Sequence, residues 1–141
     1  NRGVRPMKIR EYFEHTEGYG VLSTASPSGR VDAALYAKPY FIDDETIAFI
    51  MADRLTYRNL KVNPYASYLF LEEEKFLRGA RLYLTKKKEE RNPELIDELR
   101  QLRHYISQDE IYEEDTYLVY FTIDKVLPLI GSEHEGLGPI S

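Results

Sequence analysis

Three side chains in one short stretch of the sequence are suited to holding an anion. Arg54, Thr56 and Arg58 surround the start of a predicted helix, Leu55–Val62, which follows a predicted strand, Thr46–Ala52. The start of a helix presents unpaired backbone N–H groups and the positive end of its dipole, and both attract a phosphate. The sequence therefore predicts a phosphate site at this strand-to-helix junction. Spacing alone leaves a second interpretation open, in which the arginines only offset the charge of a chain with 24 acidic and 19 basic residues.

Local signals define the elements around this junction. The acidic turn Asp43–Glu45 precedes the strand, and Asp53 is placed to cap the helix. Asn63-Pro64 ends the helix, because proline disfavours a helical conformation in the residue before it. Tyr65–Leu71 then has the aromatic and apolar composition of a further strand. The helix carries few apolar residues, so we expect it to be a connector between two strands rather than part of the core.

Composition excludes several other kinds of chemistry. The chain has no cysteine, which excludes disulfides, thiolate nucleophiles and cysteine-ligated metals. His15, His104 and His134 lack the paired spacing of metal ligands. No nucleophilic serine motif, Walker loop or dinucleotide-binding glycine motif is present. We therefore predict no metal site, and the sequence assigns no catalytic residue.

The charge of the chain bears on its partners and location. A net charge of -5 and a pI near 5.3 argue against nucleic-acid binding, which depends on clustered basic residues. Glu89 and Glu90 follow the basic run Lys86–Lys88, so this run is interpreted as a solvated strand end. The apolar runs are strand-sized and no secretion signal precedes them. We expect a cytoplasmic protein with neither a nucleic-acid nor a membrane partner.

The whole pattern predicts a mainly β fold with accessory helices. One short helix, Lys8–Glu14, precedes the first strand, and Asn92-Pro93 begins another helix. We expect Leu95, Leu99, Leu102 and Ile106 to bury one side of that helix, with Arg100 on the solvent side. The strands number six, and their hairpin-length connections predict a small antiparallel barrel. We expect the domain to span residues 7–130, with residues 131–141 as a tail and residues 1–6 as a cloning remnant or a flexible leader.

The first half of the chain resembles a known family. The resemblance lies in Arg58-Asn59-Leu60 after the third strand, in Asn63-Pro64, and in the hairpin built from Gly20–Thr24, Ser26–Gly29 and the long strand Val31–Ile42. These segments are similar to those of the pyridoxamine 5′-phosphate oxidase-like FMN-binding split-barrel family. The resemblance implies a six-stranded antiparallel split β-barrel that binds FMN between the two subunits of a homodimer.

The resemblance also implies where the cofactor binds. The flavin ring is expected over the second and third strands and the phosphate at the helix start. The expected cofactor-binding residues are Tyr36, Ala37, Lys38, Ile50, Met51, Arg54, Leu55, Thr56 and Arg58. Thr56 stands where members commonly carry a lysine, and Ala34 and Pro39 stand where the true oxidases carry an arginine and a lysine. These departures argue against pyridoxine phosphate oxidation itself, and Arg54 is placed to supply the missing charge.

Several functions are compatible with these features. The first is an FMN-dependent oxidoreductase or electron carrier that acts on a small molecule which the sequence does not specify. A second is haem-related oxidation, which some relatives perform, although the sequence offers only isolated histidines as axial ligands. A third is a non-catalytic module for flavin storage, redox sensing or ligand binding, because fold does not fix function. The sequence identifies no nicotinamide site and hence no electron donor.

Overall fold

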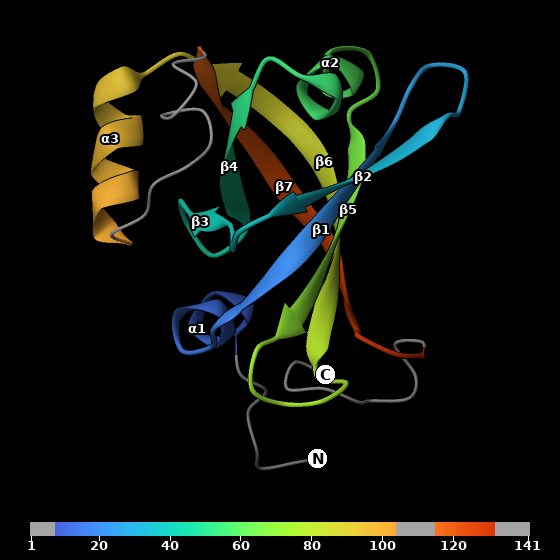
Figure 1. Cartoon of the computed structure of the whole chain (residues 1–141), viewed down its shortest axis with the longest axis vertical. Helices are drawn as coiled ribbons and strands as arrows, with labels where there is room; N and C mark the ends of the chain where they lie inside the picture. The colour runs from blue at the N-terminus through green and yellow to red at the C-terminus, as the bar shows by residue number, and fades with distance from the viewer. Residues whose placement is uncertain (1–7, 104–114, 132–141) are drawn as a thin grey trace.

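A single antiparallel sheet organises the chain. The computed structural model describes residues 8–103 and 115–131, and there it contains seven strands in the order β2-β1-β5-β6-β7-β4-β3. All neighbouring strands run antiparallel, and the sheet is strongly curled (Figure 1). The strands are β1 (Gly18–Ala25), β2 (Val31–Tyr36), β3 (Tyr40–Phe41), β4 (Thr46–Ala52), β5 (Tyr65–Glu72), β6 (Gly79–Glu90) and β7 (Thr116–Pro128). The predicted mainly β, antiparallel class is confirmed.

The strand count differs from the six that we predicted because the long strand Val31–Ile42 is divided. It forms β2 and β3, separated by the link Ala37–Pro39. Pro39 has no backbone N–H and disfavours regular pairing, so the chain leaves the sheet at this point. After the link it rejoins the sheet at the opposite edge, since β2 and β3 are the outermost strands of the sheet. The two edges of the curled sheet are therefore joined by a covalent connection.

Aromatic side chains fill the interior of the curled sheet. Phe49, Tyr68, Phe70 and Phe121 are buried in the main core and contact one another at edge-to-face, tilted or offset ring geometries. Alternation in the sequence of β6 predicts that Leu82 and Leu84 share one face, and both are buried in this core while Tyr83 between them is exposed. Close packing on this face even constrains the backbone: a Cβ at Gly20 would meet the Tyr68 ring at 2.4 Å.

Two short helices cover parts of the core. Helix α1 (Ile9–Glu14) matches the prediction and buries Tyr12 and Phe13 against the main core. Helix α2 (Leu55–Val62) also has the predicted bounds, but the prediction that it is only a connector was wrong. Its Tyr57 and Leu60 belong to the main core. Composition misled here because tyrosine was not counted among the core residues, although its ring is largely apolar.

Helix α3 (Pro93–Leu102) lies on the outside of the sheet beside β4 (Figure 1). Its start is as predicted, because the Asn92 side chain accepts a hydrogen bond of 3.2 Å from Leu95 N. The predicted buried stripe is only partly correct. Ile96 is fully buried against Leu118, Leu95 and Leu99 are partly buried, and Leu102 is exposed.

Arg100 corrects the prediction for the outer face of α3. We expected it in solvent, and it is buried. Ile96 and Arg100 are four residues apart and therefore lie on the same side of the helix, the side that faces the sheet. Ile106, the last residue of the predicted stripe, lies outside the described residues. Among residues 8–103 and 115–131, no helix is long and apolar enough to cross a membrane.

Candidate functional site

The junction between β4 and α2 is the helix start at which the sequence predicts a phosphate site. Arg54 is the N-cap residue, its backbone is extended, and its side chain, which has no acceptor atom, caps none of the N–H groups of the first turn. The prediction that Asp53 caps the helix was therefore wrong. Asp53 instead uses its carboxylate to bind Arg58, which lies one turn further along the helix. The first backbone N–H groups of α2 thus keep their capacity to bind an anion.

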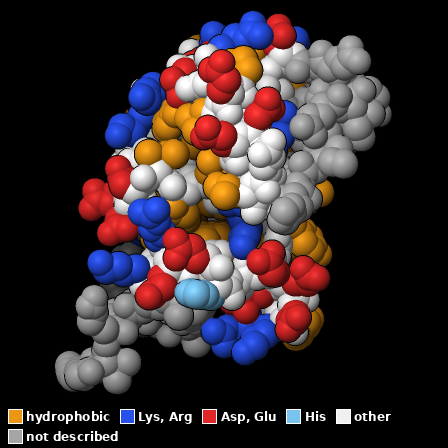
Figure 2. Space-filling view, turned by 90° about the vertical axis from the view of Figure 1, so that its left-hand side faces the viewer, with side chains coloured by type: hydrophobic (Ala, Val, Ile, Leu, Met, Phe, Trp, Pro, Cys, Tyr) orange, Lys and Arg blue, Asp and Glu red, His pale blue; other side chains and the backbone are white. Residues whose placement is uncertain are grey.

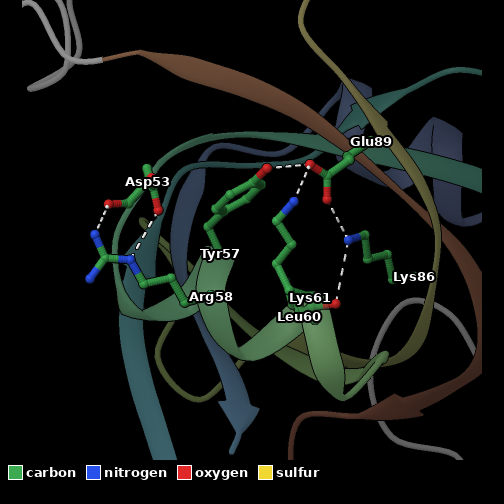
Figure 3. A network of polar contacts seen from close by, with 7 residues as sticks. All are labelled: Asp53, Tyr57, Arg58, Leu60, Lys61, Lys86 and Glu89. Carbon is green, nitrogen blue, oxygen red and sulfur yellow. Dashed lines mark hydrogen bonds and ion pairs between the residues drawn. The ribbon is translucent and has the colours of Figure 1, made fainter.

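The two predicted arginines occupy different positions at this junction. Arg58 donates from Nε to Asp53 Oδ1 at 3.0 Å and from a terminal nitrogen to the Asp53 carbonyl at 3.1 Å, as Figure 3 shows. Arg54 and Leu55 are exposed at the start of the helix. The charge of Arg58 is therefore already offset by a carboxylate, and Arg54 is the cation nearest the open backbone groups in sequence.

Thr56 connects this junction to β2. It is only 4 % exposed, and its hydroxyl Oγ1 lies 3.5 Å from Asp32 Oδ2, the limit of a hydrogen bond. Sequence reasoning missed Asp32 as part of this site. The signal was available, since Asp32, Ala34 and Tyr36 alternate along β2 with the exposed residues on its other face.

A buried amide holds α2 against the sheet. Asn59 Nδ2 donates a hydrogen bond of 3.0 Å to the hydroxyl of Thr24 on β1, and both side chains are buried. Because buried polar groups are costly unless they are paired, this contact fixes the position of the helix. The Asn59 of the Arg-Asn-Leu segment thus has a structural role here.

On the other side of α2, a polar network joins the helix to β6 (Figure 3). The Tyr57 hydroxyl donates to Glu89 Oε2, and Lys61 Nζ lies 3.4 Å from the same oxygen. Lys86 Nζ donates to Glu89 Oε1 at 2.6 Å and approaches the Leu60 carbonyl at 3.4 Å. One carboxylate therefore gathers a tyrosine and two lysines between a helix and a strand.

The network changes the acidity of its members. Burial, together with the hydrogen bond to Glu89, raises the pKa of Tyr57 to about 12. Burial alone would raise the pKa of Glu89, but the hydrogen bonds from Lys86 and Tyr57 and the nearby positive charges outweigh it, so that pKa is lowered. At neutral pH the tyrosine is therefore protonated and the glutamate is charged, which is the pairing that the geometry requires.

A β-bulge makes this network possible. Lys86 pairs with Phe121 and Lys88 pairs with Tyr120, so Lys87 is an extra residue in β6. In a regular strand, residues three apart point to opposite faces, and the extra residue brings Lys86 and Glu89 to the same side. The prediction that this run is a solvated strand end was wrong for Lys86, whose side chain is 14 % exposed.

The residues predicted to lie under the flavin ring begin at the end of β2. Tyr36 is partly buried, its ring contacts Phe49 edge-to-face at 5.7 Å, and its carbonyl accepts a hydrogen bond of 3.0 Å from the Tyr68 hydroxyl. Ala37 is half-buried in the link that follows. Lys38 Nζ donates to the Phe13 carbonyl in α1 at 2.9 Å, and to the Thr16 carbonyl and the Glu17 carboxylate just after the helix at 3.0 and 3.2 Å. Lys38 thus fastens α1 to this link, and its role toward a flavin stays a prediction.

Arg103 holds the same link from the other side. Its terminal nitrogens donate to the carbonyls of Lys38 at 2.5 Å and Pro39 at 2.6 Å. Its guanidinium lies 3.8 Å from the centre of the Tyr40 ring, a cation–π contact. The link between β2 and β3 is therefore fixed by both α1 and the end of α3.

The two other residues predicted to lie under the flavin ring, Ile50 and Met51, are on opposite faces of β4. Met51 is fully buried in the main core, whereas Ile50 packs on the side covered by α3. The structure thus brings Arg54, Leu55, Thr56 and Arg58 together at the helix start, while Tyr36, Ala37 and Lys38 follow one another at the end of β2. Among the described residues, no group of three metal-ligating side chains is present.

These features define a small antiparallel split barrel with an open helix start at its edge. No protein-family model and no curated protein matches the sequence. Several solved structures match the fold. An FMN-binding protein from Syntrophomonas wolfei subsp. wolfei is 22% identical, with 88% of this chain and 85% of that chain covered and a TM-score of 0.65.

Two further structures support the same class. An F420 reductase is 18% identical over 79% of this chain and 90% of that chain, with a TM-score of 0.66. A candidate pyridoxamine 5′-phosphate oxidase from Lactobacillus delbrueckii is 11% identical over 89% of this chain and 97% of that chain, with a TM-score of 0.59. The chain therefore has the split-barrel fold of the pyridoxamine 5′-phosphate oxidase-like proteins, and the resemblance seen in the sequence is confirmed for the fold.

Proposed function

We propose that this protein binds FMN and acts as a flavin-dependent oxidoreductase or electron carrier on a small molecule. The observation that carries the proposal is the start of α2, where the N-cap residue is Arg54 and its side chain does not cap the first turn. This start lies at the edge of a split barrel, and one of the solved structures with this fold is an FMN-binding protein. Bound flavin would supply hydride or single-electron transfer, and the protein would position and tune it.

The described residues fit the two ends of an FMN molecule unequally. Backbone N–H groups of α2 and the Arg54 guanidinium suit a phosphate, because both are donors that favour negative charge. Tyr36 offers a partly buried aromatic edge for the ring. Met51 is enclosed by the core, so we expect it to support the ring site from behind rather than to touch the ligand.

We further propose that the protein is a homodimer and that the second copy covers the outer face of β2, β1, β5 and β6. Cross-strand pairs place Leu35 beside Val21, Val21 beside Leu69, and Ser67 beside Tyr83 on this face. Its exposed apolar residues are Tyr19, Val31, Leu35, Tyr65, Leu69 and Tyr83. An apolar area of this extent is typical of a surface that another protein covers. A stable obligate dimer typically buries about 2,000 Å² or more.

Figure 2 views the molecule from the side that carries α3 and α1. A hollow in this face has hydrophobic side chains at its floor and charged side chains around it. Apolar hollows with few charges are the usual form of small-molecule sites, so this face is where we would place the substrate.

Absorbance spectroscopy tests the cofactor proposal. We expect the purified protein, mixed with FMN and passed through a desalting column, to retain a stoichiometric flavin spectrum. Reduction of that flavin by NADH or NADPH would identify the electron donor. A Soret band after incubation with haem, without flavin retention, would favour haem-related oxidation. Retention of neither cofactor would contradict the proposal.

Sedimentation at micromolar and nanomolar concentrations tests the assembly. We expect a dimer whose stability depends on protein concentration. A folded monomer that holds one FMN throughout this range would contradict the shared site. A cytoplasmic location is part of the same proposal, and fractionation of the source cells is its test.

A further inference from the structure

The start of α2 has an acidic neighbour that a phosphate site does not need. Asp32 projects from β2 toward the helix, and its carboxylate lies 3.5 Å from the hydroxyl of Thr56, the second residue of α2. Thr56 is almost fully buried, so the contact is part of the packed structure rather than of a solvated side chain. The chain therefore places an anion of its own next to the positive end of this helix.

Charged side chains of both signs lie around the junction. Arg58 is bound to Asp53, Asp32 approaches Thr56, and Arg54 is the N-cap residue of the helix. A phosphate monoester brings about −1.5 to −2 charges at neutral pH. It would gain from Arg54 and the backbone N–H groups, and it would be repelled by Asp32. The two effects act on the phosphate alone, because the flavin ring and its ribityl chain are uncharged at neutral pH.

We propose that Asp32 determines specificity at this site by opposing the phosphate, so that the protein binds riboflavin about as tightly as it binds FMN. This inference rests on the proposed flavin function. The ligand class is then a flavin recognised mainly through its ring and hydroxylated side chain. A site in which the phosphate dominates recognition would instead bind FMN far more tightly than riboflavin.

The ratio of two dissociation constants tests the proposal without any measurement of enzymatic activity. FMN and riboflavin are each titrated into the wild-type protein and two variants, with quenching of flavin fluorescence as the signal. For the wild type we expect the two constants to agree within about threefold. In Asp32→Asn, loss of one like charge near a partly exposed phosphate should raise the affinity for FMN about tenfold and leave that for riboflavin within about twofold.

Asp44→Asn is the matched control. It removes the same charge from the protein, but Asp44 lies in the turn before β4, at the opposite end of that strand from α2. The length of β4 separates it from the junction by roughly 20 Å, which is beyond the screening length at physiological salt. We expect both flavins to bind this variant as they bind the wild type. Asp32→Glu keeps the carboxylate and should keep the wild-type ratio.

Several results would overturn the proposal. A wild-type protein that binds FMN at least thirtyfold more tightly than riboflavin would refute it, and this holds even if Asp32→Asn does not fold. Equal changes for both flavins in Asp32→Asn would also refute it, because the effect would then not act on the phosphate. Failure of the wild type to bind either flavin would refute the proposed function together with this inference. In the first two results, by contrast, the wild type binds flavin, and only this inference fails.

Discussion

Replacing Glu89 with glutamine should lower the stability of the protein strongly, although glutamine has the same shape as glutamate. The Glu89 carboxylate accepts from the Tyr57 hydroxyl and from Lys86, and its side chain is 22 % exposed. The amide keeps the shape but loses the charge, which leaves the largely buried Lys86 ammonium without its anion. Breaking a fully buried pair costs about 3 to 5 kcal/mol, and a charged hydrogen bond contributes about 1.5 to 3 kcal/mol. Partial exposure reduces the first figure, so we expect a loss of about 2 to 3 kcal/mol.

Thermal and denaturant unfolding measure this loss. For a chain of this length, about 2 to 3 kcal/mol corresponds to a fall in Tm of roughly 6 to 10 °C. Tyr57→Phe removes one hydrogen bond to the charged Glu89 carboxylate and should cost about 1.5 kcal/mol, the lower end of the range for a charged hydrogen bond. Lys61→Gln is the control, because the Lys61 side chain is 54 % exposed and its ion pair with Glu89 is worth well under 1 kcal/mol.

The pH dependence of stability gives an independent check on the same carboxylate. The pKa of Glu89 is lowered in the folded protein, so the unfolded state takes up a proton more readily than the folded state does. The stabilisation is therefore complete above the ordinary glutamate pKa of about 4.3 and is lost as the pH falls through the lower folded value. Glu89→Gln should lack this acidic loss. A change below about 0.5 kcal/mol at pH 7, with an unaltered acid profile, would refute our account of the network.

Three further predictions concern other parts of the molecule. Arg54→Ala should weaken FMN binding about tenfold in calorimetric titration and leave riboflavin binding unaffected. Arg58→Ala should weaken FMN binding less, because the Arg58 side chain is already ion-paired with Asp53. Arg100→Gln should lower stability by more than about 1 kcal/mol in thermal melting, because the side chain is buried, while exposed Gln101→Ala should stay within about 0.5 kcal/mol. Burial raises the pKa of Tyr120 to about 12, so the contribution of this hydroxyl to stability is present below about pH 10 and is lost as the pH rises through 12. Thermal unfolding of Tyr120→Phe at alkaline pH should not show that loss.

Local patterns were sufficient for most of the elements. The bounds of α2 followed from Asn63-Pro64, and the start of α3 followed from Asn92-Pro93, since both signals act on the adjacent backbone. Leu82 and Leu84 were assigned to the core from alternation alone. These features depend on nearest neighbours in the sequence, which is the information that one sequence contains.

The features that were missed depend on contacts between segments far apart in the chain. The bulge at Lys87 is defined by the register of β6 against β7, and Arg100 is buried because of what α3 packs against. Asp32 enters the candidate site only because α2 folds back over β2. For the candidate site, the sequence indicated the helix start and its arginines, but it did not reveal that Asp53 binds Arg58 or that Asp32 lies beside Thr56.

The link Ala37–Pro39 joins the two outermost strands of the sheet. The two edges are therefore connected by the polypeptide itself, and Arg103 holds the connecting link through hydrogen bonds to two of its carbonyls. A protease cut within the link, or a circular permutant that opens there, would sever that bond while leaving every strand pairing intact. The two outermost strands, which are not paired with each other, would then be free to move apart, and unpaired strand edges are templates for association with other chains. The integrity of this short segment therefore limits how far the two edges of the sheet can separate.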